Sequence, residues 1–227
     1  MNKKTMLIIS LIFSILALLY LISDYYGGNR YIMMHMKDQD NYIKNYTKLQ
    51  KASKERVIVC FSNNDPNLPN INPFLNSILD QTVRIDEIML ITPYSNIEKI
   101  PEKYKKILTV HGHHKNYYNV SSLICSVLTE PEANTKIIIV DSSIVYPVDF
   151  IETMVSESDK HPDKIIYGSQ DKDVKYGILI KSQFFDDRIS KDTINKSSTC
   201  SDYLNKYSNS KSSVVVNPGV FYQIFRS

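Results

Sequence analysis

The chain has 227 residues, of which 43% are hydrophobic and 22% are charged, a composition typical of one folded core domain with additional segments. The formal net charge is only +3 and no basic patch with interleaved aromatic residues is present, so nucleic acid is not a predicted partner. The three cysteines, at positions 60, 125 and 200, have no CxxC or metal-ligand spacing, which argues against a disulfide framework, although one bridge is compatible with the count.

The first feature along the chain is an apolar stretch at residues 6–23 that contains no charge. Its length is about the minimum for a helix that crosses a bilayer. We predict a signal anchor, with a cytosolic tail at 1–5 that carries Lys3 and Lys4. The chain would then be a single-pass type II membrane protein with its bulk luminal or extracytoplasmic. A cleaved signal peptide is the alternative, but its apolar core is usually shorter and ends at a small-residue site, and no A-x-A pattern follows Ser23.

Residues 24–55 are polar and rich in Met, Lys and Asp after a break at Gly27 and Gly28. Tyr42, Tyr46 and Leu49 recur at helical spacing, which indicates an amphipathic helix. We expect this segment to be a stem that separates the membrane from a globular domain at 56–227.

The globular part alternates short apolar runs with amphipathic segments, which predicts an α/β fold with a mostly parallel sheet. Strands are expected at 57–61, 87–92, 107–110, 137–140, 165–168, 176–180 and 214–216, helices at 73–79, 120–128 and 148–155, and a short helix or loop at 97–106. The Ser-, Lys-, Asn- and Asp-rich segment 190–213 is expected to be a mobile loop around a short helix. No GxGxxG, P-loop, GxSxG or HExxH motif is present, so a dinucleotide-binding Rossmann domain is disfavoured.

The strand expected at 137–140 is an unbroken run of branched apolar residues, as in a strand buried on both faces. It ends in Asp141, which is followed by Ser142 and Ser143. Ligands of open α/β sheets bind beyond the carboxyl ends of the strands, so a carboxylate here could hold a metal or a sugar hydroxyl. The alternative is that Asp141 only caps the next turn.

Four blocks, in this order, give the domain a familiar pattern. They are 57–62 with 75–82 and 86–88; 116–123; 138–147; and 176–180 with 184–187 and 200–204. Over residues 56 to about 207 the chain resembles GT-A-type glycosyltransferase-like proteins of bacteria and viruses. There the corresponding blocks read L-x-S-I-L-x-Q-T with D-E-I, D-Y-G-P-x-T-K-L, a strand with D-D-D and Tyr-Pro, and a late Gly segment with S-D-D.

The resemblance implies a membrane-anchored protein that transfers a sugar from a nucleotide-sugar donor to an acceptor hydroxyl. Asp141 would match the first Asp of the D-x-D element, which helps to hold the donor and a divalent metal, Mn²⁺ or Mg²⁺. Asp202 would match a late acidic residue that acts as catalytic base. The donor-binding positions of the family correspond here to Ser62, Asn63, Asp65, Ser122, Asp141 and Ser143.

Several charged positions of the family pattern are replaced in this chain. Ser142 and Ser143 stand where the family has two Asp, and a hydroxyl is a poorer ligand than a carboxylate for a hard divalent cation. Ser122 replaces a Lys and Asn116 replaces an Asp. These losses motivate a second hypothesis, a catalytically inactive relative that serves as a binding or scaffold module for an unidentified partner. A structural membrane protein without a ligand is a third.

Three histidines lie close together after the third expected strand, at positions 111, 113 and 114. They could replace some of the missing charge, or they could belong to an ordinary solvated loop.

Overall fold

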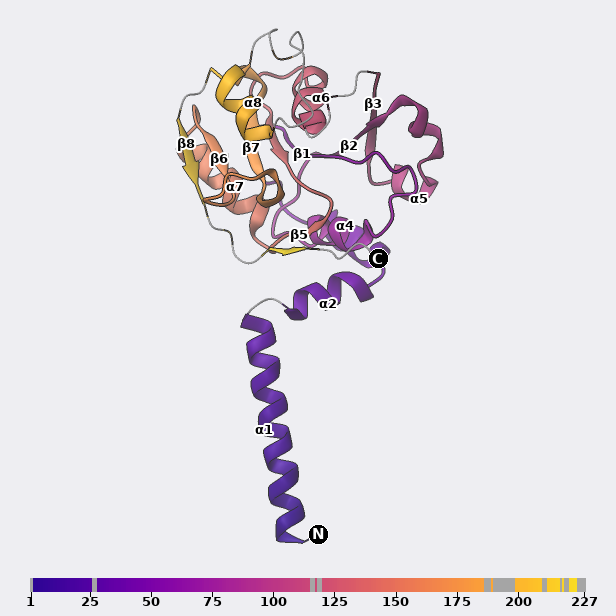
Figure 1. Ribbon diagram of the computed structural model, residues 1–227, viewed down its shortest axis with the longest axis vertical. Coiled ribbons are helices and arrows are strands. Elements are labelled where there is room, and N and C mark those ends of the chain that lie inside the picture. The colour runs from indigo at the N-terminus through magenta and orange to yellow at the C-terminus, as the bar shows by residue number, and fades with distance from the viewer. Residues whose placement is uncertain are drawn as a thin grey trace.

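A seven-stranded sheet organises the domain, with the strand order β3-β2-β1-β4-β7-β6-β8 (Figure 1). The computed structural model describes residues 2–25, 28–114, 117, 120–185, 189, 199–209, 212–216, 218 and 221–223. The strands are β1 (Val57–Ser62), β2 (Glu87–Pro93), β3 (Thr109–His113), β4 (Lys136–Ile139), β6 (Ile165–Tyr167), β7 (Ile178–Lys181) and β8 (Ser213–Val215). Two short strands, β5 (Ile144–Val145) and β9 (Tyr222–Gln223), pair separately and antiparallel.

The sheet is mostly parallel, as predicted. The pairs β1–β2, β1–β4, β2–β3 and β6–β8 are parallel, whereas β7 is antiparallel to both β4 and β6. Since β7 reverses between them, β4 and β6 point in the same direction. The carboxyl ends of β1, β4 and β6 therefore meet at one edge of the sheet.

Helices cover both faces of this sheet. On one face lie α4 (Asn72–Leu79) and α7 (Phe150–Lys160), and on the other lie α6 (Ser121–Thr129) and α8 (Cys200–Tyr207). Side chains of β1 alternate between the two apolar cores, with Val59 and Phe61 on the α4 side and Ile58 and Cys60 on the α6 side, because successive side chains of a strand point to opposite faces.

The segment expected as a short helix or loop at 97–106 includes the end of a 3₁₀ helix, η1 (Tyr94–Lys99), and the whole of the short helix α5 (Glu102–Lys105). The strand expected at 176–180 begins later, because a second 3₁₀ turn, η3 (Val174–Tyr176), precedes β7. A further 3₁₀ turn, η4 (Ser182–Phe184), follows β7. In the region expected as a mobile loop, residues 190–198 and 210–211 lie outside the described residues.

The predicted stem contains two helices, α2 (Gly28–Met36) and α3 (Gln39–Tyr46), and both contact α4. Met34 and Tyr42 are buried in the domain core. The Asn76 side-chain amide donates hydrogen bonds to the carbonyls of Met34, at 2.9 Å, and Lys37, at 3.2 Å. Most of the interval between the apolar stretch and residue 56 therefore lies against the domain.

Helix α1 (Lys3–Tyr25) projects from the domain and none of its residues is buried (Figure 1). At 1.5 Å per residue it is about 34 Å long, enough to cross a hydrocarbon core of about 30 Å. Its apolar window has a mean hydropathy of 2.7. By length and composition it suits a membrane span, and a signal sequence at this position would have the same properties.

A fully buried lysine, Lys136, lies at the start of β4, at the edge opposite the strands' carboxyl ends. Its ammonium contacts the carboxylates of Glu55, at 2.7 Å, and Asp159, at 2.8 Å, and the Ser53 hydroxyl at 2.8 Å. The hydrogen bond with Lys136 holds the pKa of Glu55 below its usual value of about 4.5. The Glu55 carboxylate thus supplies a counter-charge that the buried ammonium needs.

This ion cluster predicts acid-dependent stability. A carboxyl with a depressed folded pKa stabilises the protein above its unfolded pKa, and that contribution is lost as the pH falls through the folded pKa. We therefore expect the Tm of the wild-type chain to decrease as the pH is lowered below 4.5. The Tm of Glu55→Gln should decrease less steeply over the same range. Thermal unfolding across this pH range measures both slopes, with Glu102→Gln at an exposed carboxylate as control. Equal slopes for wild type and Glu55→Gln would contradict this account.

Candidate functional site

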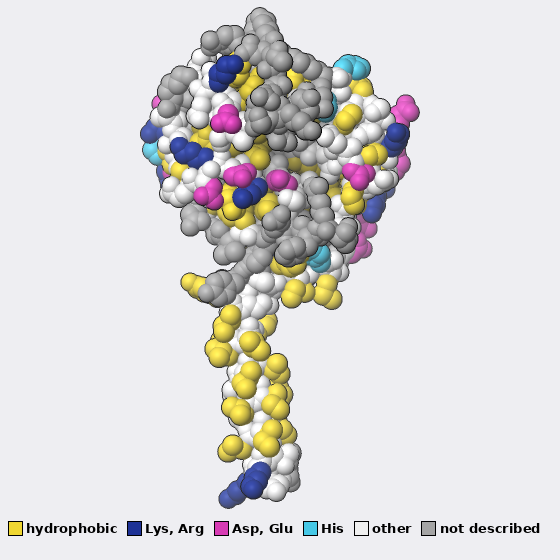
Figure 2. All heavy atoms as spheres, in the orientation of Figure 1, with side chains coloured by type: hydrophobic (Ala, Val, Ile, Leu, Met, Phe, Trp, Pro, Cys, Tyr) yellow, Lys and Arg dark blue, Asp and Glu magenta, His cyan; other side chains and the backbone are white. Residues whose placement is uncertain are grey.

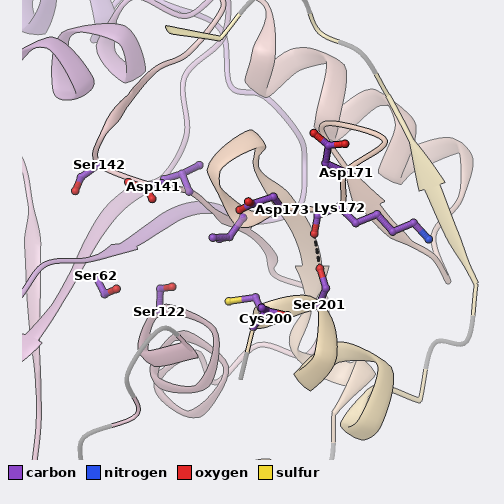
Figure 3. A pocket seen from close by; sticks show the side chains of 12 residues that line it. Ser62, Ser122, Asp141, Ser142, Asp171, Lys172, Asp173, Cys200 and Ser201 are labelled. Carbon is purple, nitrogen blue, oxygen red and sulfur yellow. Dashed lines mark hydrogen bonds between the residues drawn. The ribbon is translucent and has the colours of Figure 1, made fainter. Parts of the chain in front are cut away.

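A polar cavity of about 430 Å³ opens at the edge where β1, β4 and β6 end (Figure 3). This is the edge at which open α/β sheets bind ligands. Its lining consists of Ser62, Ser122, Val140, Asp141, Ser142, Asp171, Lys172, Asp173, Val174, Thr199, Cys200 and Ser201. Hydroxyls and carboxylates dominate this list, so the cavity suits a ligand rich in hydrogen-bond donors.

Asp141 follows β4 and takes part both in the next turn and in the lining of the cavity. Its Oδ1 accepts a hydrogen bond from the Ser143 amide at 2.7 Å, so the carboxylate caps the next turn. It is only half-buried and also lines the cavity. The two alternatives posed for this residue, turn cap and ligand-facing carboxylate, are therefore compatible in the structure.

The fully buried Tyr146 connects the Asp141 turn to the loop 168–177. Its hydroxyl accepts a hydrogen bond from the Asp141 amide at 2.9 Å and donates one to the Lys175 carbonyl at 2.9 Å. Burial raises the pKa of Tyr146 well above its usual value, so the hydroxyl keeps its proton at neutral pH. Its ring packs against Phe74, Phe150 and Phe221.

The loop between β6 and β7 supplies the side of the cavity that sequence reasoning missed. Asp171 and Asp173 line the cavity from this loop, and the Asp173 carboxylate also accepts a hydrogen bond from the Lys175 amide at 3.0 Å. The Ser201 hydroxyl donates to the Lys172 carbonyl, which ties the loop to the start of α8. The sequence signal that could have revealed this side of the cavity is the run Asp-Lys-Asp at 171–173, which follows the strand predicted at 165–168.

The Lys172 side chain extends away from the other labelled residues (Figure 3). Its Nζ lies 5.4 Å from the centre of the Tyr167 ring and 3.4 Å from the Ser213 Oγ. Three carboxylates, those of Asp141, Asp171 and Asp173, therefore line the cavity, and the Lys175 ammonium lies 3.6 Å from the Asp173 carboxylate.

The donor-binding positions implied by the resemblance fall into two adjoining places. Ser62, Ser122 and Asp141 line the cavity, whereas Asn63, Asp65 and Ser143 line a smaller hollow of about 70 Å³. Ser142 borders both. The binding role of these residues stays a prediction.

Asp202, the predicted catalytic base, lies in the first turn of α8 and forms a capping box with Thr199. Its carboxylate accepts hydrogen bonds from the Thr199 hydroxyl, at 2.7 Å, and amide, at 3.1 Å. These bonds lower the pKa of Asp202. Its neighbours Thr199, Cys200 and Ser201 line the cavity, but Asp202 is not among the lining residues. Its catalytic role stays a prediction.

The donor set for a divalent metal is thin. Among the described residues, no three His, Cys, Asp or Glu side chains come together as a metal-binding group. His111 approaches Glu87 at 3.7 Å, His114 stacks on Tyr94, and His113 lies beside Tyr117, so the histidines have separate surroundings. The residues do not form a metal centre by themselves, and Mn²⁺ or Mg²⁺ at Asp141 would need most of its ligands from phosphate and water.

The cysteines do not form a disulfide or a reactive site. All three are buried, and none forms a disulfide. Burial raises the pKa of Cys200, which lines the cavity, to about 12, so its thiol is protonated at neutral pH and is a poor nucleophile.

The sequence matches no family model and no curated protein. Among solved structures, the chain is similar to the crystal structure of GalNAc-T7 with UDP, GalNAc and Mn²⁺, with a TM-score of 0.41 and 15% sequence identity. The match covers 49% of this chain and 22% of that one. The chain thus spans about a fifth of the length of that protein, and the functional assignment depends on the chain's own residues.

Proposed function

We propose that the chain is a membrane-anchored glycosyltransferase-like protein that binds a nucleotide sugar and transfers the sugar to an acceptor hydroxyl. The observation that supports this proposal is the meeting of Ser62, Ser122 and Asp141 at one polar cavity. These residues belong to three separate blocks of the sequence resemblance. A chance set of surface positions has no reason to converge at the ligand-binding edge of the sheet.

The chemistry of the cavity suits a sugar. Its volume of about 430 Å³ lies within the usual range for small-molecule sites, roughly 300–1,000 Å³. Carboxylates such as Asp141 and Asp173 accept hydrogen bonds from sugar hydroxyls, and these charge-assisted bonds are the stronger kind. The neighbouring hollow beside Asn63 and Asp65 would receive the nucleotide end of the donor.

In this proposal Asp141 orients the donor and Asp202 accepts the proton of the acceptor hydroxyl. A divalent cation, when bound, would neutralise charge on the diphosphate. The side chain that would hold it is Asp141, and the diphosphate oxygens would supply further ligands. Asp202 would need to exchange its bonds with Thr199 for a bond to the acceptor.

A second candidate is a non-catalytic relative that binds the same donor without transfer. Two observations favour it. The Asp202 carboxylate caps α8 rather than lining the cavity, and the Lys172 ammonium lies toward Ser213 instead of the cavity. The Lys175 ammonium is already paired with the Asp173 carboxylate, at 3.6 Å, so within the described residues little unpaired positive charge is available to a leaving diphosphate.

Turnover of nucleotide sugars separates the two candidates. We expect the full-length protein in detergent to hydrolyse a nucleotide sugar with Mn²⁺ present, and Asp202→Asn to lose about 100-fold of this rate, a typical contribution of a general base. Asn retains a side-chain oxygen that can accept the hydrogen bond from the Thr199 amide in the capping box, so the Tm should stay near that of the wild type.

Asp149→Asn, at an exposed position before α7, is the control and should keep full activity. Donor binding without turnover in the wild-type protein would select the second candidate. Neither binding nor turnover across a panel of uridine and guanosine diphosphate sugars would contradict both.

A further inference from the structure

Helix α2 has two faces of opposite character. Toward the domain it directs Met34, which is buried, and Tyr31, which packs against the core. On the outside, Ile32, Met33 and Met36 are 53%, 41% and 80% exposed. Met36 lies four positions after Ile32 and three after Met33, and residues at these spacings share one side of a helix, so the three form a continuous apolar face.

We propose that α2 is an interfacial helix that lies in the head-group layer of the membrane and seats the domain on it. The inference rests on the membrane anchoring in the proposed function and is independent of sugar transfer. The proposed binding partner of the apolar face is the lipid surface, because helices with one apolar face lie in the membrane–water interface with that face embedded roughly 5–10 Å deep.

The short connection between α1 and α2 is the main support for placing α2 at the membrane. Helix α1 ends at Tyr25 and α2 begins at Gly28, and this interval can span at most about 10 Å. If α1 crosses the bilayer and ends at its surface, the start of α2 must lie close to that surface. Figure 2 shows hydrophobic side chains continuing from α1 onto the underside of the domain at α2.

The inner side of α2 is held by directed polar bonds. The Arg30 Nε donates to the Tyr146 carbonyl at 3.0 Å, and its Nη2 donates to the Ser77 carbonyl at 3.3 Å. The same guanidinium forms an ion pair with Asp80. These bonds fix the rotation of α2 about its axis, so its apolar face points away from the domain. Embedding that face would give the domain one orientation on the membrane.

The chain contains no Trp, so one introduced Trp reports its own surroundings. We expect the full-length variants Ile32→Trp and Met36→Trp, in phosphatidylcholine vesicles, to lose fluorescence when the lipids carry bromine on their acyl chains. Bromine near the head group should quench more than bromine near the chain end, given the shallow depth. Leu128→Trp is the control, because Leu128 is 52% exposed on α6, far from α1 (Figure 1), and should keep its fluorescence.

Flotation of each variant with the vesicles tests anchoring separately. A chain that floats but shows no more quenching at positions 32 and 36 than at 128 would overturn the interfacial helix and leave the anchor intact. A chain that does not float would overturn both. A spectrum that shifts with protein concentration, without bromine quenching, would assign the face to a second copy of the chain and also overturn the proposal. The unfolding temperature of each variant verifies the fold.

Discussion

Gly168→Ala is expected to destabilise the protein by about 3 kcal/mol, the upper part of the range for forced overpacking. A Cβ at this position would lie 1.9 Å from the Tyr176 carbonyl oxygen. The clash is with backbone, so a rotamer change cannot relieve it. The backbones at the end of β6 and the start of β7 approach closely here, and the Gly168 amide donates a hydrogen bond to the Gly177 carbonyl at 2.9 Å.

The loop 168–177 carries Asp171 and Asp173 into the cavity, so Gly168→Ala should also weaken ligand binding. Denaturant titration gives the change in the free energy of unfolding. Gly28→Ala, at the start of α2, is the matched control, since the nearest atom to its added Cβ would be the Oγ of Ser23 in α1, at 2.8 Å, which a rotamer change can move. Wild-type stability for Gly168→Ala would show that the β6–β7 hairpin does not have this close approach.

Tyr146→Phe is expected to cost about 2 kcal/mol, the scale for leaving buried polar groups without a partner. Removing the hydroxyl deprives the Asp141 amide and the Lys175 carbonyl of their shared partner. The ring stays, so the aromatic packing changes little. We also expect weaker ligand binding, because the hydroxyl holds the two sides of the cavity together.

Tyr104→Phe is the control for this variant. Tyr104 is also buried, and its hydroxyl bonds the Asn72 side chain at 2.9 Å, away from the cavity. It should lose about 1 kcal/mol, a typical net hydrogen bond, without a change in ligand affinity. Equal effects of the two variants on binding would show that Tyr146 has no special role at the site.

The central strands and the main helices could be predicted from the sequence because their signals are local. The branched apolar runs in β1 and β4 require burial on both faces, and the stripe around Leu123 and Ile124 fits one helix face. The position of Asp141 at a strand end followed from the same pattern. Its meeting with Ser62 was expected from the family resemblance, and it is possible because parallel strands end at one edge of the sheet.

Strand direction and long-range docking could not be predicted in this way. An apolar run such as that in β7 does not indicate whether the strand pairs parallel or antiparallel to its neighbours, so its antiparallel placement depends on the tertiary fold. The packing of α2 depends on contacts such as Arg30 with Asp80, which no local period reveals. The Asp171–Asp173 side of the cavity was missed because its contribution depends on β6 lying parallel to β4, two places along the sheet.

Calorimetric titration of the full-length protein with UDP and GDP, with and without Mn²⁺, tests the central claim most directly. We expect one nucleotide to bind in a Mn²⁺-dependent manner. Binding should disappear in Asp141→Ala and persist in Asp149→Ala, which removes an exposed carboxylate outside the cavity. Binding of neither nucleotide, or equal binding by wild type and Asp141→Ala, would contradict a donor site at this cavity.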